Sequence, residues 1–349
     1  QDGGTPTTLA NLVDSPLIPI TIAQGRNGQY FNGSIDEVIV WNRSLNDNEI
    51  WTHYVRYRGG CLEITEDLKI GGDTNICNST LNYYYNDSAQ DGVIQIKANN
   101  INLNLNGSIL IGNNTLGEST RAIYDGVGYS NITIRNGEFR VYQSAIRLIN
   151  SNDVTITNVT LNHSRVGIAI SDLADNVLVR NSTFNNANIG IYIQDKVNNI
   201  TVQDSRFNNA TIYIDNLAGE EVSTNITIER NYWENSTIVP STIYQIRLGN
   251  SSNVIIRNNK FWNNTKTTGG NIQPKGSNNV DIYNNVFDIN DKAIYFDTYF
   301  GKNFKIYNNT FNMSITNTDA FDTAIIIEGD REVSYTTWNW TNIWIYNNT

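Results

Sequence analysis

The chain has 349 residues, with 24 Lys and Arg against 34 Asp and Glu and a net charge of −10 at pH 7. This charge argues against nucleic acid and anionic membrane surfaces as partners, because both repel an acidic protein. No apolar run approaches the length of a membrane-spanning helix, so we expect membrane contact only through segments outside this chain. Two His and two Cys form no cluster at zinc-ligand spacing, which predicts no zinc centre.

Residues 1–58 carry the phrase Gly33-Ser-Ile-Asp-Glu-Val, followed by Asn42-Arg-Ser-Leu. These phrases resemble the closing strands of a laminin-G-like, concanavalin-A-like jelly roll. The resemblance implies a short helix over residues 47–57. The segment is shorter than the roughly 100 residues of a complete β-sandwich. We therefore expect a partial β-sandwich whose remainder lies outside this chain.

Residues 59–125 are interpreted as a linker and the first cap of a solenoid. The only two cysteines, Cys61 and Cys77, lie here. We predict a disulfide between them, which would contribute about 3 kcal/mol by loop entropy and would indicate an oxidising compartment. The alternative is two free thiols. The stretch from Ile101 to Gly107, Ile-Asn-Leu-Asn-Leu-Asn-Gly, resembles the first coil of archaeal and bacterial surface β-helix proteins.

Residues 126–349 repeat one nine-residue phrase, first seen as Asn131-Ile-Thr-Ile-Arg-Asn-Gly-Glu-Phe139. Starts are separated by 22 to 39 residues, and most of them by 22 to 28. A period of this length on a β-rich phrase predicts one coil per repeat, stacked on its neighbours. The phrase begins at the following residues: Asn131, Asp153, Asn176, Asn199, Asn225, Asn253, Asn279, Asn303 and Asn342.

Within the phrase, apolar residues alternate with variable ones, as in Ile226-Thr-Ile228, which predicts a strand with one buried face. The position eight residues after the start is aromatic or Leu and should fill the core. The position five residues after the start is mostly Asn, which suits the left-handed backbone of a turn and could form an amide ladder. Arg230 interrupts this column, so we expect a bulge there. We expect the ladder amides to point inward, including those within Asn-X-Ser/Thr sequons: Asn158, Asn181, Asn308 and Asn347.

A second short strand recurs, for example Gly167-Ile-Ala-Ile170 and Gly190-Ile-Tyr-Ile193. Two or three strands in each coil predict an all-β fold, a right-handed single-stranded parallel β-helix. The columns of residues 97–349 resemble the pectate-lyase-like superfamily. That superfamily contains lyases, hydrolases, adhesins and phage spikes, so the resemblance indicates the fold and leaves the chemistry open.

Three tyrosines of the second strand, Tyr192, Tyr213 and Tyr295, should point outward and offer apolar faces for sugars. Acidic residues follow them, and neighbouring coils could share a calcium ion between their carboxylates. A solvated sheet face is the alternative. The candidate acids of this glycan site are Asp195, Asp215 and Asp297.

The stretch from Asn317 to Asp322, Asn-Thr-Asp-Ala-Phe-Asp, resembles the Asn-Thr-Asp-Gly-Ile-Asp motif of polygalacturonases. The resemblance implies acid and base roles for Asp319 and Asp322. The other motifs of that family are missing, so we expect no catalytic site here.

Many Asn-X-Ser/Thr sequons fall on expected turns, which predicts N-glycosylation of a secreted protein, although an Asn- and Thr-rich solenoid also produces sequons by chance. The candidate sites are Asn32, Asn42, Asn78, Asn86, Asn113, Asn162, Asn209, Asn235, Asn250, Asn263 and Asn312.

The sequence thus favours an extracellular or cell-surface, non-catalytic glycoprotein that binds glycans. It also predicts self-assembly into a filament or surface layer, because a solenoid that stops in mid-coil leaves strand edges for another copy. The alternative function is a secreted polysaccharide lyase or glycoside hydrolase with a carbohydrate-binding jelly roll.

Overall fold

The structure is a computed structural model, and the chain divides into two units, Gln1–Leu45 and Asn46–Thr349. It describes residues 43–45, 49–51, 53, 60–65, 67–77, 83–85, 87, 89–112, 120–216, 222–234, 244–262, 270–289, 292–296, 301–313, 324–327 and 340–349. Most of the predicted jelly roll, residues 1–58, therefore lies outside the described residues.

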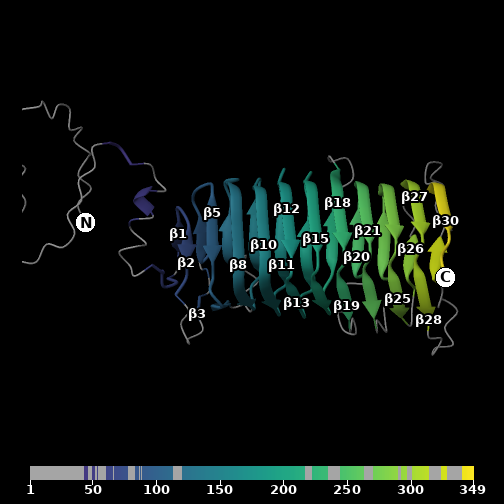
Figure 1. The fold of residues 1–349 in the computed structure, drawn as a ribbon, viewed down its shortest axis with the longest axis horizontal. Coiled ribbons are helices and arrows are strands. Elements are labelled where there is room, and N and C mark those ends of the chain that lie inside the picture. Colours follow the sequence, from purple (N-terminus) through teal and green to yellow (C-terminus); the bar gives the residue numbers. More distant parts are fainter. Residues whose placement is uncertain are drawn as a thin grey trace, which may run out of the picture. The chain divides into compact units, whose positions relative to one another are not determined.

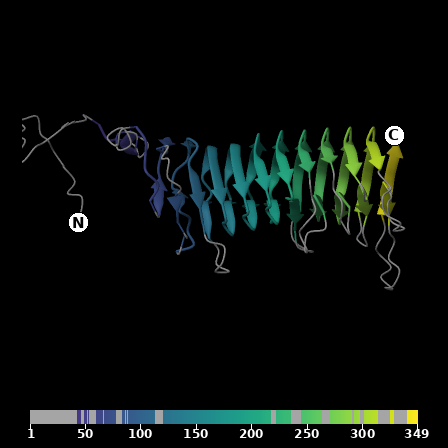
Figure 2. The same cartoon turned by 90° about the horizontal axis from the view of Figure 1, so that it is seen from below.

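The second unit is a parallel β-solenoid whose coils follow one another in chain order along one axis (Figures 1 and 2). One face is an eleven-stranded parallel sheet, to which each coil contributes one strand. In register order its strands are β1 (Leu68–Ile70), β4 (Ile94–Ile96), β7 (Arg121–Asp125), β9 (Ser144–Ile149), β11 (Val166–Ser171), β14 (Ile189–Ile193), β17 (Ile212–Asp215), β20 (Ile246–Gly249), β23 (Ile272–Lys275), β26 (Ile294–Phe296) and β29 (Ile325–Ile327).

The nine-residue phrases form two further parallel ladders. The phrase ladder consists of β2 (Thr74–Asn75), β5 (Ile101–Asn104), β8 (Ser130–Arg140), β10 (Asn152–Asn162), β12 (Asp175–Arg180), β15 (Asn198–Gln203), β18 (Ser223–Glu229), β21 (Ser251–Arg257), β24 (Asn278–Tyr283), β27 (Gly301–Tyr307) and β30 (Trp340–Tyr346). The short-strand ladder adds β3 (Tyr83–Tyr84), β6 (Ile109–Ile111), β13 (Thr183–Asn185), β16 (Arg206–Asn208), β19 (Tyr232–Glu234), β22 (Lys260–Trp262), β25 (Val286–Ile289) and β28 (Thr310–Met313). The two ladders meet at β8 and β10, which are long enough to pair in both.

The predicted inward columns form the core. Ile226 and Ile228 are fully buried, whereas Thr227 between them is half-buried on the outer face. The aromatic column stacks from coil to coil with ring centroids 4.6 to 5.1 Å apart, which matches the spacing of hydrogen-bonded strands. The stacked rings are Phe184, Phe207, Trp233, Phe261, Phe287 and Phe311. The alternation in the sequence therefore predicted both the strands and their buried face.

The predicted turn column takes the left-handed backbone in every coil of the repeat, with φ from 50° to 61°. Arg230 has φ 54° as well, and strand pairing keeps the same 28-residue offset on both sides of it, so the predicted bulge is wrong. Arg230 instead pairs with Asp204, at Nε–Oδ1 2.8 Å. The inward orientation is also wrong, because a left-handed turn residue lies at the outer corner of the coil. The exposed residues are Asn158, Asn181, Asn308 and Asn347.

The predicted column forms an amide ladder only in part, as in Asn158 Nδ2 to Asn136 Oδ1 at 2.7 Å, and the buried amide ladder lies one residue later. Asn259 Nδ2 donates to Asn285 Oδ1 at 3.0 Å, and Asn231 Nδ2 donates to Asn259 Oδ1 at 3.2 Å. Each amide also donates to a carbonyl oxygen of the preceding coil, such as Ile228 O for Asn259 at 2.9 Å. These side chains satisfy backbone groups at the turn, where strand pairing is interrupted. The ladder consists of Asn231, Asn259, Asn285, Asn309 and Asn348.

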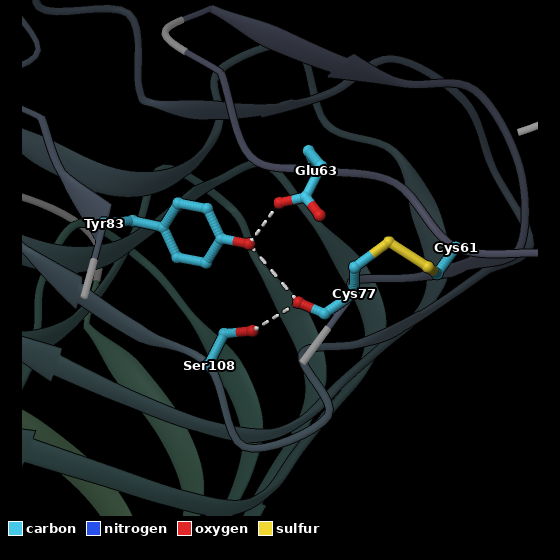
Figure 3. Close-up of a disulfide and its surroundings, with 5 residues drawn as sticks. All are labelled: Cys61, Glu63, Cys77, Tyr83 and Ser108. Carbon is cyan, nitrogen blue, oxygen red and sulfur yellow. Dashed lines mark hydrogen bonds between the residues drawn. A yellow bond between two sulfur atoms is a disulfide. The ribbon is translucent and has the colours of Figure 1, made fainter. Parts of the chain in front are cut away.

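A disulfide closes the first coil, as predicted. Cys61 and Cys77 are bonded, with a Cα–Cα distance of 5.0 Å (Figure 3). The Tyr83 hydroxyl donates to Glu63 Oε2 at 2.7 Å and lies 3.3 Å from the Cys77 carbonyl oxygen, while the Ser108 hydroxyl lies 3.4 Å from the same oxygen (Figure 3). The disulfide is thus tied to the next coil.

Residues 49–51 and 53 are helical, within the helix predicted over residues 47–57. Trp51 packs against the core of the solenoid, and its indole N–H donates to Thr74 Oγ1 at 3.0 Å. The predicted jelly-roll boundary at residue 58 stays a prediction. Residues 49–51 and 53, which lie before that boundary, belong to the second unit. No helix within the described residues is long and apolar enough to cross a membrane.

Candidate functional site

The outer face of the eleven-stranded sheet carries a long row of in-register side chains, and a shorter row, which includes Asp215 and Lys275, lies two residues further along the strands. Tyr192 and Tyr213, predicted to point outward, are direct partners on β14 and β17. The row reads Gln95, Tyr124, Arg147, Ala169, Tyr192, Tyr213, Arg247, Gln273, Tyr295 and Ile326. No residue type repeats along it for more than two coils, in contrast to the buried columns.

Tyr192 and Tyr213 form a half-buried aromatic pair with ring centroids 5.7 Å apart and planes tilted by 48°. Arg247, the next residue of the row, lies over the Tyr213 ring with its guanidinium carbon 4.6 Å from the centroid, and it donates to the Tyr213 hydroxyl. Burial, followed by the charge of Asp215, raises the pKa of Tyr192. The Tyr192 phenol is therefore neutral at pH 7, and its ring borders an open space.

The third predicted tyrosine is on the same row but apart from the pair. Arg247 and Gln273 separate Tyr295 from Tyr213. The ammonium of Lys292 lies 4.8 Å from the centre of the Tyr295 ring. The structure thus brings together two of the three tyrosines.

Two of the predicted acids lie at the carboxyl-terminal edge of this sheet. Asp195 Oδ2 accepts a hydrogen bond from Gln194 Nε2 at 2.7 Å. Burial raises the pKa of Asp215, with the charge of Lys275 opposing this and that of Asp195 adding to it. Asp297 lies outside the described residues. Within the described ranges, no group of three or more His, Cys, Asp and Glu lies where it could hold a metal ion.

A cleft of about 290 Å³ opens beside Tyr192, over β9, β11 and β14. Ala169 occupies the outward position of β11, between Arg147 and Tyr192. Two rungs of about 4.8 Å separate those larger side chains, and the single methyl between them leaves the space open. We call this the Ala169 cleft. It is lined by Arg121, Gln143, Ser144, Arg147, Arg165, Val166, Ala169, Ser171, Ile189, Tyr192 and Gln194.

Three arginines line the Ala169 cleft of this acidic protein. Neither Arg147 nor Arg165 donates a side-chain hydrogen bond or forms an ion pair within the described part of the chain, and the Arg147 Nε is buried. Burial, followed by the charge of Arg147, lowers the pKa of Arg121. The Arg121 guanidinium lies 4.6 Å from the centre of the Tyr124 ring and donates to the Gln90 carbonyl oxygen. The charge of Asp87 acts on Arg121 in the opposite direction to burial. Among the described residues, Arg147 and Arg165 have no such acidic partner, so positive charge gathers in the cleft.

Sequence reasoning missed these arginines, although one signal was available. Arg147 occupies the same column of its short strand as Tyr192 and Tyr213, so the outward row could have been extended to it. Arg121 and Arg165 lie at the amino-terminal edge of the sheet, where the repeat has no fixed column. Their convergence depends on the stacking of coils.

A second groove, of about 590 Å³, runs across the outer face of the phrase ladder, beside Ile255 and Trp344. One wall is a ladder of exposed amides in which each Asn donates to the Asn of the previous coil, as in Asn279 Nδ2 to Asn253 Oδ1 at 3.0 Å. Its amides are thus already engaged with one another. The Ala169 cleft, with unpaired guanidinium groups beside an aromatic face, is the stronger candidate site.

The remaining predicted site residues are only partly described. Asp319 and Asp322 lie outside the described residues, as do the sequons at Asn32, Asn42, Asn78, Asn86, Asn113, Asn235 and Asn263. Of the other sequons, Asn312 is exposed, and Asn209 and Asn250 are half-buried. The Asn162 side chain is engaged, because its Nδ2 donates to Glu138 Oε1 at 2.5 Å and its Oδ1 accepts from Asn185 at 2.8 Å.

Comparisons with known proteins agree with the fold. Residues 72–222 match the family model described as "Right handed beta helix region". No curated protein matches the chain. Among solved structures, DFA-IIIase from Arthrobacter chlorophenolicus A6 in complex with GF2 is similar, at 11% identity and a TM-score of 0.54, over 74% of this chain and 68% of that one.

Two further solved structures are similar. The Streptococcus pneumoniae surface protein and adhesin PfbA shares 15% identity at a TM-score of 0.50, over 80% of this chain and 87% of that one. A mutant tailspike protein of E. coli bacteriophage HK620 in complex with a pentasaccharide shares 12% identity at a TM-score of 0.56, over 93% of this chain and 62% of the tailspike. At such identities the likeness shows the fold alone. The second unit of the chain is a right-handed parallel β-helix.

Proposed function

We propose that this protein is an extracellular or cell-surface, non-catalytic glycan-binding protein that holds saccharides in the Ala169 cleft. The observation that carries the proposal is the open space between Arg147 and Tyr192, which places an aromatic face next to unpaired hydrogen-bond donors. Sugar rings combine apolar C–H faces with hydroxyl groups, and such a cleft offers a partner for each.

Two further observations support an extracellular glycan-binding role. The Cys61–Cys77 disulfide is typical of proteins that fold outside the cytoplasm. Similar β-helices include a surface adhesin and a tailspike in complex with a pentasaccharide. The proposed role also agrees with the acidic composition, which disfavours nucleic acid.

Screening the chain against an array of immobilised glycans, followed by calorimetric titration of the strongest ligand, tests the proposal. Tyr192→Ala should weaken binding at least about tenfold, because it removes one wall of the cleft. Tyr283→Ala is a matched control: Tyr283 also stacks on a neighbouring tyrosine, Tyr307, at 4.8 Å, but on the phrase ladder. Equal losses in both variants, or no binding to any glycan of the array, would overturn the proposal.

Titrations with calcium and with EDTA separate direct binding from the predicted calcium bridge between Asp195 and Asp215. Loss of binding in EDTA, with recovery on adding calcium, would indicate a shared ion. Equal affinity in the two buffers would remove calcium from the proposal.

A glycan-degrading enzyme is the second candidate function. It is favoured by Asp215, whose pKa is raised by burial first and by the charge of Asp195 among the lesser causes. Glycosidases use such pairs, with the acid of raised pKa protonating the leaving group. Release of reducing ends or unsaturated products from polysaccharides, abolished in Asp215→Asn, would establish this activity. A lack of products over long incubation would favour binding alone.

Self-assembly and N-glycosylation stay predictions. Light scattering across salt and calcium concentrations would detect filaments or lattices of the chain. Mass spectrometry of protein from a glycosylating host would show which sequons are occupied, and we expect Asn312 to be favoured over Asn162, whose amide is already engaged.

A further inference from the structure

We propose that the Ala169 cleft recognises an anionic substituent of a saccharide, a carboxylate or a sulfate, through the guanidinium groups of Arg121, Arg147 and Arg165. This inference rests on the proposed glycan-binding function and names the chemical class of its ligand. It depends on charges and unpaired atoms that the aromatic pair alone does not explain.

The first step concerns the unfavourable free energy of placing several arginines close together. Arg147 and Arg121 are close enough for the charge of each to act on the other, and both are half-buried. Like charges repel, and withdrawing them from water adds a desolvation cost. Nothing in the packing of the solenoid requires a charge at this position, because Ala169 and Tyr192 fill the same column in the next two coils.

The second step is the set of unpaired donors. The Nε atoms of Arg121 and Arg147 and the hydroxyl of Ser144 are buried and have no hydrogen-bond partner among the described residues. Ser144 is only 7% exposed, and all three residues line the cleft. Buried donors in native proteins normally have acceptors, and each one left unpaired destabilises the fold. A ligand that brings several acceptor oxygens would satisfy them together.

The third step is the polarity of the cleft. Arg121 begins β7 and Arg165 immediately precedes β11, so both lie at the amino-terminal edge of the sheet. Asp172 and Asp195 lie past the opposite ends of the strands, where they accept hydrogen bonds from Ser171 and Gln194. Asp87 lies beside Arg121 at the arginine end, but three arginines outnumber it, so the field favours an anion there. The sugar ring that carries it then reaches the Tyr192 face.

The fourth step is the geometry of the donors. A guanidinium presents a planar fork that matches the two oxygens of a carboxylate or sulfate, whereas a neutral hydroxyl uses one donor at a time. Arg147 lies on the row directly beside Ala169, and its buried Nε has no acceptor among the described residues, so it is the residue best placed for such a contact. Arg165 is exposed and adds attraction from the rim.

Titration calorimetry in EDTA with four probes tests the inference: alginate oligosaccharide, its carboxyl-reduced form, dextran sulfate oligosaccharide and unsulfated dextran oligosaccharide. We expect one anionic probe to bind at least about tenfold more tightly than its neutral counterpart, with an affinity that falls as salt is added. Comparison of the alginate and dextran sulfate titrations shows whether the cleft prefers a carboxylate or a sulfate.

Variants separate a built site from general charge attraction. Arg147→Ala should weaken binding of the favoured anionic probe at least about tenfold, and Arg147→Lys should restore only part of this affinity because it keeps the charge and loses the fork. Arg180→Ala is the matched control, since Arg180 is exposed on the phrase ladder and the same charge is removed. Arg180→Ala should bind like the wild type.

Failure of this inference is distinguishable from failure of the proposed function. Equal binding of anionic and neutral probes, with loss in Tyr192→Ala but not in Arg147→Ala, would overturn the anion inference and leave glycan binding intact. Equal weakening by Arg147→Ala and Arg180→Ala would also overturn it. If no probe bound and the glycan array were also blank, both proposals would be wrong.

Discussion

The outer faces of the phrase ladder and of the eleven-stranded sheet differ in how their side chains satisfy hydrogen-bonding groups. On the phrase ladder, the row of leading Asn residues repeats, and its side chains bond to one another, as Asn279 does to Asn253. On the eleven-stranded sheet the residue type of the outward row varies along the coils, and the buried Nε of Arg147 has no partner among the described residues. A repetitive, satisfied row needs nothing beyond the chain. The irregular, unsatisfied row marks the surface on which a ligand is expected.

The largest expected effect on stability comes from comparing the inner and outer positions of one phrase strand. Ile228→Asp buries an unpaired carboxylate in the core and should lower the free energy of unfolding by several kcal/mol. Thr227→Asp, one residue away on the outer face, should cost less than about 1 kcal/mol. Thermal melts of the two variants check this. Similar shifts would mean that the assignment of inner and outer faces is wrong.

A second test compares the buried and exposed amide ladders. Asn259→Ala leaves the backbone N–H of Asn231, which donates to Asn259 Oδ1 at 2.9 Å, without its acceptor. We expect a loss of about 1–3 kcal/mol. Asn253→Ala breaks an exposed rung and should cost under about 1 kcal/mol, since water replaces the lost bond. Urea denaturation measures both, and equal losses would remove the distinction between the two ladders.

A third test asks whether the irregular row is optimised for stability. Arg147→Met keeps most of the side-chain volume and removes both the buried donor and the repulsion of Arg121. We expect the melting temperature to be unchanged or slightly higher, by under about 1 kcal/mol in stability, while binding of the anionic probe is lost. A marked drop in melting temperature would instead assign Arg147 a structural role.

The smallest expected effect is on the pH dependence of stability. The pKa of Asp215 is raised from its ordinary value of 3.8, mainly by burial, so the folded state favours the protonated carboxyl. Asp215 therefore contributes stability below pH 3.8 that is lost as the pH rises through the higher folded pKa. Relative to the wild type, Asp215→Asn should become more stable as the pH rises from about 3 to about 7. Parallel pH profiles of wild type and variant would contradict the shift.

Much of the fold could be predicted from the repeat. Hydrophobic alternation identified the inner face of each phrase strand, and the eight-residue column identified the stacked rings from Phe184 to Phe311. Cys61 and Cys77 were predicted to pair, and they are bonded. The wrong predictions concern the turn, where a shift of one residue decides whether a side chain points into the core or toward solvent. Asn in a left-handed corner and Asn in a buried ladder look alike in a sequence, so the inward column was placed one residue early.

The candidate site could be predicted only in part. Tyr192 and Tyr213 lie on the same strand position of adjacent coils, so the sequence period was enough to pair them. Tyr295 fits the same pattern, but the intervening coils carry Arg247 and Gln273, which a search for tyrosines passes over. Arg121 and Arg165 precede or begin their strands and fit no column. Loop lengths between coils vary, so residue spacing in the sequence could not predict that these two arginines lie close together.

By itself, the sequence determined a right-handed parallel β-helix, the inner face of its strands and a disulfide in the first coil, because those features follow from local periodicity and from the only two cysteines. Tertiary structure alone decided which outward residues of successive coils become neighbours. Residues such as Arg121 and Arg147 are 26 positions apart in the chain and share one cleft only because parallel coils stack in register. The unpaired donors and the gap at Ala169 arise from that stacking.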